Sequence, residues 1–235
     1  MQTRELLARF QWEAPAKTSM LLTKHGFDHG FYGTSDSAPE CHHVRQVHGT
    51  KIVPISAEST SAKAPHRVEA DALYTFERDT FIAVKTADCI PILVAIPGQM
   101  VAGIHAGWRG LTRGIIMNSV DKLVDSGKDA SRMIAVVGPT ISRERFEVGS
   151  EVVDALLTPA SGLSMEQAAF TLSKGIGDRW HLDLQVAAAL ALTNAGIAPE
   201  NIGVIQACTY SRTDWNSFRR DAKGAGVNWS WIRLS

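Results

Sequence analysis

Two apolar runs meet at the dipeptide Pro97-Gly98, and this feature constrains the fold most. The first run spans residues 90–96, and the second spans 101–104 at the start of V-A-G-I-H-A-G-W-R-G. Proline fixes its own φ and glycine accepts a positive φ, which are the two conformations that the centre of a type II turn needs. We therefore predict a β-hairpin of residues 90–96 with 100–105. Since neither run has a polar face, both strands should be covered on both sides.

Strand and helix patterns alternate along the rest of the chain. Three further strands and two long helices are predicted, at residues 72–75, 81–84, 133–137, 111–126 and 183–194 respectively. Each long helix is followed by a glycine that can end it. A shorter helix is expected around 165–170, and residues 56–65 have the small polar composition of a loop. This alternation predicts the α/β class, in one domain over residues 1–235.

The charge balance points away from nucleic-acid and membrane surfaces. Lysine and arginine together number 24, as do aspartate and glutamate, so the formal net charge is zero and no basic face is indicated. We expect a small-molecule substrate, with no nucleic acid and no membrane as partner.

Cysteine usage and the N-terminus indicate the cytoplasm. The 3 cysteines are too few for a disulfide framework. The first ten residues carry charges within their apolar run, and no stretch of the chain is apolar enough to span a membrane. We expect a cytoplasmic protein and a monomer, although the sequence sets no oligomeric state.

The open end of the predicted hairpin brings two reactive side chains together. Cys89 directly precedes the first strand, and His105 ends the second. A turn at Pro97-Gly98 places them opposite each other or one step diagonal, and facing Cβ atoms lie roughly 4.5–5.5 Å apart. A thiolate and an imidazole there could share a metal ion or form a Cys-His catalytic pair. A register shifted by one residue would point them to opposite faces.

A third candidate is His48, in the segment V-R-Q-V-H-G-T-K-I-V at 44–53. Gln46, His48 and Thr50 alternate there with apolar residues, which is also the pattern of a strand with one face in solvent. The local pattern therefore leaves the role of His48 open.

Several motifs occur in the order that characterises a known family. They are R-Q-V-H-G at 45–49, A-D-A-L-Y-T at 70–75, T-A-D-C-I-P at 86–91, H-A-G-W-R-G at 105–110, G-P-T-I at 138–141, F-E-V-G at 146–149, H-L-D-L at 181–184, A-C-T at 207–209 and S-F-R-R at 217–220. On these motifs the chain resembles the YfiH-like proteins, which were first called laccase-domain or polyphenol oxidase proteins and are now described as purine nucleoside phosphorylases. The resemblance implies an α/β fold layered as an α/β/β/α sandwich.

The resemblance also implies a metal site. In that family the histidine of Q-V-H-G, the cysteine of A-D-C and the histidine of H-A-G-W-R-G bind zinc, so His48, Cys89 and His105 are expected to hold Zn²⁺ and to carry catalysis, with copper as the alternative ion. Three protein ligands leave the fourth tetrahedral position open, as in catalytic zinc sites.

Contacts to substrate or phosphate are expected from four further residues, Arg45, Asp88, Arg109 and Arg219. The arginines, or Arg220 in place of its neighbour, could hold phosphate by paired hydrogen bonds. Asp88 could orient His48 or His105 as a carboxylate partner, or could be a turn residue. Trp108 could stack on a base or anchor the packing.

The chain departs from the family pattern in two places. The segment between Phe27 and His48 is short, and the usual terminal T-G-R motif is replaced by G-A-G-V-N-W at 224–229. We therefore expect the walls of the substrate pocket to differ from those of the family.

Four functions fit these features to different degrees. The first, implied by the resemblance, is phosphorolysis of adenosine, inosine, guanosine or methylthioadenosine to free base and ribose 1-phosphate, with adenosine deamination as a side activity. The second is hydrolysis of an amide in a cell-wall precursor by Cys89 and His105 without an obligatory metal. Copper-dependent phenol oxidation fits poorly, because the 8 histidines include no H-x-H pair. A zinc-carrying protein without catalysis is the fourth, and the open coordination position counts against it.

Overall fold

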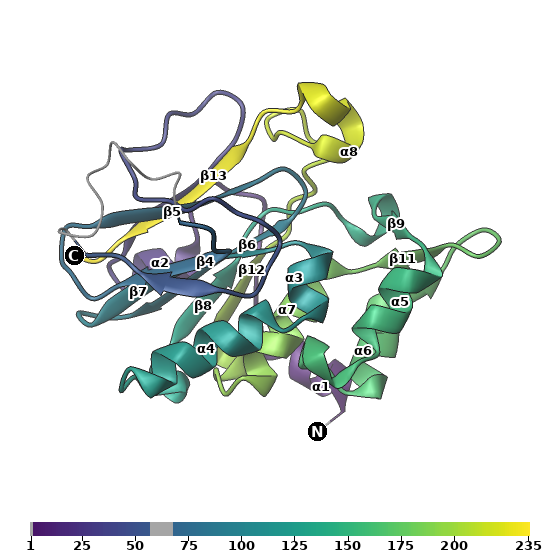
Figure 1. Ribbon diagram of the computed structural model, residues 1–235, viewed down its shortest axis with the longest axis horizontal. Helices are drawn as coiled ribbons and strands as arrows, with labels where there is room; N and C mark the ends of the chain where they lie inside the picture. Colours follow the sequence, from purple (N-terminus) through teal and green to yellow (C-terminus); the bar gives the residue numbers. More distant parts are fainter. Residues whose placement is uncertain (1, 57–67) are drawn as a thin grey trace.

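Two stacked sheets form the centre of the molecule, and most of the helices lie below the larger sheet in the view of Figure 1. The computed structural model describes residues 2–56 and 68–235. The loop expected at 56–65 lies outside the described residues, apart from Ser56.

The larger sheet has seven strands. In their order across the sheet they are β1 (Gln11–Glu13), β12 (Ile202–Ile205), β8 (Ile134–Val137), β6 (Ile90–Ile96), β7 (Met100–Ala106), β4 (Ala72–Thr75) and β3 (Ile52–Pro54). The second sheet has three strands, β2 (Asp28–Tyr32), β13 (Asn228–Arg233) and β5 (Phe81–Thr86). A third, small sheet consists of β10 (Leu172–Lys174), β11 (Trp180–Leu182) and β9 (Glu147–Val148).

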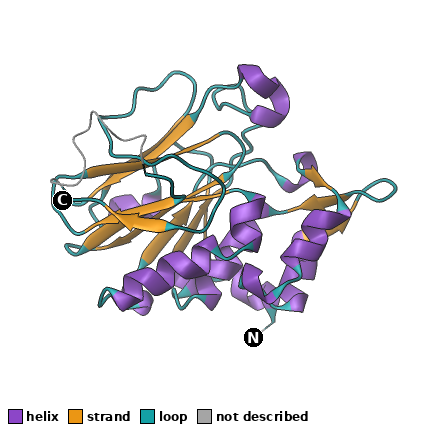
Figure 2. Cartoon of the chain, in the orientation of Figure 1, coloured by secondary structure: helices purple, strands orange, loops and turns teal. Residues whose placement is uncertain are grey.

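The helices are short, and most of them lie beneath the strands, whereas the helix near the C-terminus lies above them (Figure 2). They are α1 (Thr3–Leu7), α2 (Met20–Lys24), α3 (Trp108–Thr112), α4 (Ile115–Asp125), α5 (Ser150–Leu156), α6 (Met165–Thr171), α7 (Leu184–Asn194) and α8 (Phe218–Asp221). Helices α4 and α7 pack against the larger sheet. Within residues 2–56 and 68–235, no helix has both the length and the apolar character needed to cross a bilayer.

Strand β6 separates two hydrophobic cores. Its side chains at Ile92 and Val94 belong to the core shared with α4 and α7, whereas those at Leu93 and Ala95 belong to the core between the two sheets. Side chains alternate along a strand, so a continuously apolar run is buried on both faces. The prediction of doubly covered strands is confirmed, because every residue of β6 and β7 is buried.

The predicted hairpin is also confirmed, with one residue more in its loop than the dipeptide alone. Ile96 pairs with Met100, the amide of Gln99 donates to the carbonyl of Ile96 at 3.0 Å, and Gly98 has a φ of 66°. The turn therefore includes Gln99, and this length sets the register of the whole hairpin.

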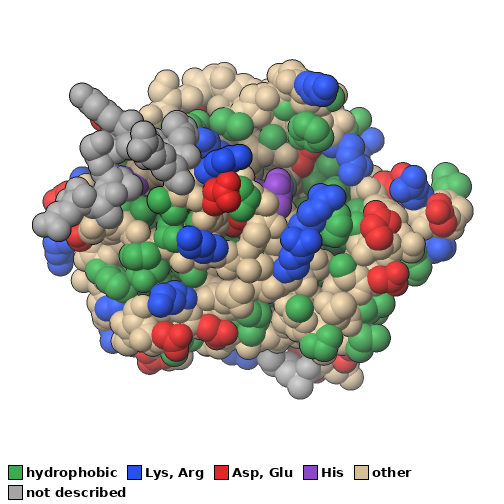
Figure 3. Space-filling view, in the orientation of Figure 1, with side chains coloured by type: hydrophobic (Ala, Val, Ile, Leu, Met, Phe, Trp, Pro, Cys, Tyr) green, Lys and Arg blue, Asp and Glu red, His purple; other side chains and the backbone are tan. Residues whose placement is uncertain are grey.

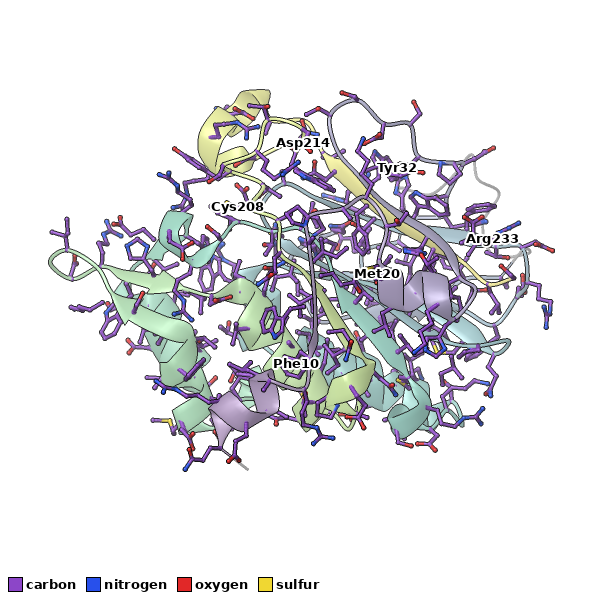
Figure 4. All side chains as sticks on the ribbon, turned by 180° about the vertical axis from the view of Figure 1, so that it is seen from behind. Phe10, Met20, Tyr32, Cys208, Asp214 and Arg233 are labelled. Carbon is purple, nitrogen blue, oxygen red and sulfur yellow. The ribbon has the colours of Figure 1, made fainter. Side chains whose placement is uncertain are left out.

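From behind, Figure 4 shows the second sheet, where Tyr32 and Arg233 mark the two ends of the pairing between β2 and β13. Tyr32 lies opposite Trp229, and Arg233 lies opposite Asp28. On β5, Ile82 and Val84 face the core between the sheets, so the residues that alternate with them face outward.

The other predicted elements are present with small shifts, and one helix differs. The strands predicted at 72–75, 81–84 and 133–137 correspond to β4, β5 and β8, and the helices predicted around 165–170 and at 183–194 correspond to α6 and α7. The helix predicted at 111–126 instead starts at Trp108 and is split into α3 and α4, because Gly114 takes a φ of 89° between them. The predicted α/β class is confirmed.

Candidate metal centre and cavity

The hairpin presents Cys89 and His105 on the same side. Ile90 pairs with Ala106 and Pro91 pairs with His105, so Cys89, one residue before β6, lies one diagonal step from His105. In this register both side chains project from the face that carries Leu93 and Ala95, toward the second sheet. The prediction of a diagonal pair is therefore met in the structure, at the end of the space between the two sheets.

His48 reaches the same place from a loop and not from a strand. The strand-like alternation around it is misleading, because His48 has a φ of 57° in a bend that precedes β3. Its backbone amide donates to the carboxylate of Asp71 at 2.9 Å, and the amide of Gly49 donates to the same carboxylate at 2.6 Å. A left-handed turn held by a buried carboxylate thus brings His48 to the hairpin.

Asp71 also orients His105. The Nδ1 atom of His105 lies 2.8 Å from Oδ1 of Asp71, and the backbone amide of His105 donates to the carbonyl of Asp71 at 2.7 Å. Asp71 is 0% exposed and His105 is 3% exposed. This contact fixes the imidazole and leaves its Nε2 atom for the site. Asp71 was missed as a site residue, although it stands in the quoted motif A-D-A-L-Y-T.

The two imidazoles differ in their affinity for protons. Burial disfavours the charged form of His105, but the hydrogen bond to Asp71 and the contact with Cys89 outweigh it and raise its pKa to about 9. Burial and the neighbouring charge of His105 lower the pKa of His48. His48 is therefore ready to offer a lone pair, whereas His105 must give up a proton when it binds a metal ion.

We call His48, Cys89, His105 and Gly107 the floor. The thiol and the two imidazoles each offer a ligand atom, and these atoms lie within 4.8 Å of one another. The space between them depends on Gly107, because a Cβ atom there would lie 2.5 Å from Nδ1 of His48 and 3.1 Å from Sγ of Cys89. One thiolate and two imidazoles are a donor set that suits zinc or copper, so these residues fit a metal ion.

Asp88 does not orient either histidine, which corrects that expectation. Its carboxylate accepts hydrogen bonds from the Thr209 hydroxyl at 2.6 Å, the Ser217 hydroxyl at 3.1 Å and the Arg219 backbone amide at 2.6 Å. Asp88 has a φ of 84° and is 8% exposed. It is therefore a buried turn residue, which was the other alternative predicted for it, and both of its carboxylate oxygens accept hydrogen bonds. Through these bonds Asp88 holds the segment 217–219, which we call the wall, close to Cys89.

The floor opens into a cavity of about 640 Å³. Apolar side chains line much of it, among them Trp108, Phe146 and Phe218. Figure 3 shows a histidine at the base of a hollow on this face, with lysine and arginine side chains around it. Trp108 therefore lies where stacking on a ligand is possible, and Phe218 on the wall is 61% exposed toward solvent.

Four cationic side chains line this cavity, and three of them are the predicted Arg45, Arg109 and Arg219. The fourth, Lys85, was missed, because a single lysine in an apolar strand carries no signal of its own. Arg220, considered as an alternative to Arg219, does not line the cavity. Its guanidinium instead donates to backbone carbonyls, including that of Trp215 at 2.8 Å, and pairs with Asp221 at 2.7 Å.

Comparisons with known proteins show which family the chain resembles in sequence. A sequence model of the family described as multi-copper polyphenol oxidoreductase laccase matches residues 33–235. A protein of Deinococcus radiodurans named purine nucleoside phosphorylase is 36% identical over 192 residues, covering 81% of this chain and 69% of the relative. A protein of an unknown prokaryotic organism named adenosine deaminase RL5 is 33% identical over 194 residues, covering 78% of this chain and 70% of the relative.

A solved structure extends the similarity to three dimensions. The crystal structure of the Bacillus licheniformis hypothetical protein YfiH superposes with a TM-score of 0.77 at 27% identity, covering 83% of this chain and 74% of that chain. The family match spans most of the chain, and both the sequence relatives and the fold agree with it. The chain therefore belongs to the YfiH-like family, whose sequence model is described as multi-copper polyphenol oxidoreductase laccase.

Proposed function

We propose that this chain is a zinc-dependent purine nucleoside phosphorylase. The observation that carries the proposal is the convergence of one thiol and two imidazoles at the base of a cavity that also presents cationic and aromatic side chains. A relative that bears the name purine nucleoside phosphorylase supports it. The cytoplasmic location, the single domain over residues 1–235 and the monomeric state stay predictions.

Zinc is the ion that we propose for the floor, held by His48, Cys89 and His105. Copper sites with one cysteine and two histidines usually add a weak axial ligand, which is a methionine, a glutamine or a backbone oxygen. Among the described residues that line the cavity there is no methionine, and the side-chain amide of Gln46 is engaged with the backbone of Lys85 at 2.6 and 2.8 Å. A bound zinc ion supplies a Lewis acid at the base of the cavity.

The residues around the floor would bind the two substrates. Trp108 and Phe218 offer aromatic faces for a purine, and the cationic side chains offer charge-assisted hydrogen bonds to phosphate. In phosphorolysis an oxygen of hydrogen phosphate forms a bond to C1′ of the ribose as the bond from C1′ to the base breaks, and the proton of the phosphate ends on the base. The contribution of the cavity is to hold both substrates in line and to exclude water, which would give free ribose instead.

The cavity has the size that this pair of substrates needs. Its volume of about 640 Å³ lies within the range of roughly 300–1,000 Å³ that is usual for small-molecule sites. We propose adenosine, inosine, guanosine and methylthioadenosine as substrates, with adenosine deamination as a side activity. The relative named adenosine deaminase RL5 supports the side activity.

A second candidate function rests on the line formed by Asp71, His105 and Cys89. The carboxylate contacts Nδ1 of His105 at 2.8 Å, and the thiol of Cys89 lies on the other side of the same imidazole. Cysteine hydrolases use this arrangement to activate the thiol. It supports hydrolysis of an amide, such as one in a cell-wall precursor, without an obligatory metal ion.

One experiment separates the two functions. Purified protein is analysed for zinc and incubated with adenosine and phosphate, and the products are separated by chromatography. We expect stoichiometric zinc and adenine release that depends on phosphate, with both lost in Cys89→Ala and both kept in Cys41→Ala, a buried cysteine outside the cavity. Adenine release that survives Cys89→Ala overturns the proposal. So does the absence of free base when inosine, guanosine and methylthioadenosine are assayed in the same way and none of the four nucleosides is cleaved. Activity on an amide that resists chelators and is lost on alkylation of Cys89 would favour the hydrolase.

A further inference from the structure

Two of the four cations in the cavity are engaged with partners from the protein itself. Arg45 forms an ion pair with Glu69 at 3.0 Å. The guanidinium of Arg219 donates to the carbonyls of Arg145 at 3.3 Å and Glu147 at 3.2 Å. These contacts hold both side chains in place and satisfy part of their hydrogen-bonding capacity.

Lys85 is different, because no carboxylate pairs with it among the described residues. Lys85 lies on the outward face of β5, half-buried at the edge of the cavity that it lines, with Nζ 5.3 Å from the ring centroid of Trp229. Its backbone is clamped by Gln46, whose amide donates to the carbonyl of Lys85 at 2.6 Å and accepts from its N–H at 2.8 Å. Burial also lowers the pKa of the Lys85 ammonium. A half-buried ammonium without a carboxylate partner among the described residues is an incomplete ion pair.

Arg109 is likewise without an ion pair in the part of the chain that the structure describes. It follows Trp108 in α3, and its guanidinium carbon lies 4.3 Å from the ring centroid of Trp108. The stacking orients the planar group, and its N–H donors have no hydrogen-bond partner within residues 2–56 and 68–235, so they can bind a ligand. The charge of Arg109 also acts on His48, so Arg109 lies close to the floor.

The described cavity lining holds one carboxylate, that of Asp88, and its oxygens are already bonded to Thr209, Ser217 and the amide of Arg219. Nothing acidic in this lining therefore balances Lys85 and Arg109. A cavity with two uncompensated cations attracts an anion of complementary charge.

The geometry points to Lys85 and Arg109 as the residues that bind a phosphate group in this cavity. Lysine binds phosphate as a point charge, and arginine binds it through paired N–H donors, so the two side chains complement each other. The inference rests on the proposed function in that inorganic phosphate is the ligand only if the protein is a phosphorylase. The phosphate group of a nucleotide has the same chemistry, and the test below distinguishes the two sources.

The test measures binding and not turnover. Isothermal titration at constant chloride follows inorganic phosphate and, separately, adenosine 5′-monophosphate with wild-type protein, Lys85→Met and Lys85→Arg. The matched control is Lys174→Met, because Lys174 also lies over a tryptophan, with Nζ 4.5 Å from the ring centroid of Trp180, but does not line the cavity. Circular dichroism and thermal melting establish that each variant is folded.

We expect Lys85→Met to weaken phosphate binding by about tenfold or more, which is the usual loss when a charged hydrogen bond is removed. Lys85→Arg should recover most of the affinity, and Lys174→Met should match the wild type. Arg109→Met should weaken binding in the same direction as Lys85→Met. If the effects appear with the nucleotide alone, the site stands and its natural ligand is a phosphate ester.

Two outcomes overturn the inference. One is an unchanged affinity of Lys85→Met for both phosphate and nucleotide, and the other is an equal loss in Lys174→Met, which would show a general effect of net charge. The proposed function fails separately. If adenosine is not cleaved but phosphate binds through Lys85, the anion site is supported and the phosphorylase function is rejected. If adenosine is cleaved but Lys85→Met binds phosphate as the wild type does, the phosphorylase function is supported and the anion site at Lys85 is rejected.

Discussion

The floor and the wall of the cavity are each organised by one buried aspartate, but the two aspartates do different work. Asp71 binds His105 directly and, through the amide of His48, the loop that carries the other histidine. Asp88 binds groups on the C-terminal segment, including the hydroxyl of Thr209 and the amide of Arg219.

The difference separates two requirements of the site. The floor needs donor atoms in fixed positions, and Asp71 meets that need from 0% exposure. The wall must lie at a fixed distance from the floor. Asp88 fixes this distance, because it is next to Cys89 and binds residues of the C-terminal segment. We therefore expect changes at the floor to affect the metal ion and changes at the wall to affect the substrate.

The largest effect should come from Gly107→Ala. Gly107 has a φ of −70° and a ψ of 165°, which alanine adopts without strain, so only the added Cβ atom matters. That atom would lie 2.5 Å from Nδ1 of His48. We expect zinc affinity to fall by more than about a hundredfold, beyond the usual cost of losing a group that orients a ligand.

Competition with a chelator of known affinity measures this change. Gly224→Ala is the control, because a Cβ atom there would have no neighbour within 4 Å. Wild-type zinc affinity in Gly107→Ala would mean that the metal ion does not occupy the space between these donors.

The next largest effect is expected from Asp71→Asn. Asparagine keeps one oxygen. Its NH₂ group would replace either Oδ1, where it would face Nδ1 of His105 and the amide of His48, or Oδ2, where it would face the amides of Val47 and Gly49. Zinc affinity should fall by about ten- to a hundredfold. The free energy of unfolding should fall by about 1–3 kcal/mol, because buried donors lose an acceptor. Chelator competition and urea unfolding measure the two quantities, and an unchanged zinc affinity would contradict the role of Asp71.

Asp88→Asn should have a smaller and different effect. It weakens the hydrogen bonds to Thr209, Ser217 and the amide of Arg219 while leaving the floor in place. We expect zinc content to stay at the wild-type level and the KM for nucleoside to rise about three- to tenfold, since substrate is held less well when its surroundings move. Hydrogen exchange in residues 208–224 should become faster.

The separate roles of the two aspartates would be contradicted if Asp88→Asn lost zinc as Asp71→Asn does. It would also break if exchange in residues 208–224 stayed at the wild-type rate, because the wall would then not depend on Asp88.

The smallest effect concerns stability away from the cavity, at His29. Burial lowers the pKa of His29, against the opposing influence of its bond to Phe27 and of the nearby Glu13 and Asp28, and its Nε2 accepts the amide of Ser19 at 2.8 Å. The unfolded chain takes up this proton near pH 6.5 and the folded chain only at lower pH. Stability present above pH 6.5 should therefore be lost as the pH falls from 6.5 toward the lower pKa of the folded state.

Urea unfolding in buffers on the acid side of pH 6.5 measures this loss. His29→Gln should show a flatter pH dependence than the wild type, and the exposed His25→Gln should follow the wild type. Equal slopes in all three proteins would show that His29 is not the responsible group.

The fold and half of the floor could be predicted from local patterns. The apolar runs and Pro97-Gly98 were sufficient for the hairpin, and the hairpin was sufficient to bring Cys89 close to His105, because register in a tight hairpin follows from its turn. His48 lies in a left-handed bend that alternation cannot reveal, so it came from the family resemblance alone.

The other errors have a common physical cause. The sequence places an aspartate beside Cys89, but which carboxylate reaches His105 depends on the pairing of β4 with β7, where Ala72 faces Ile104. The position of Lys85 at the cavity depends in the same way on how the second sheet packs. Contacts between strands far apart in the chain leave no mark in the local pattern of either strand.

The most direct test of the account is a crystal structure of the zinc-loaded protein with diffraction data collected on both sides of the zinc absorption edge. The proposed zinc site predicts one strong anomalous peak per chain, within about 2.0–2.3 Å of Sγ of Cys89 and of one ring nitrogen each of His48 and His105. The same peak should be absent from Gly107→Ala crystals treated in the same way. A peak elsewhere on the chain, or none between these three side chains, would contradict the central claim.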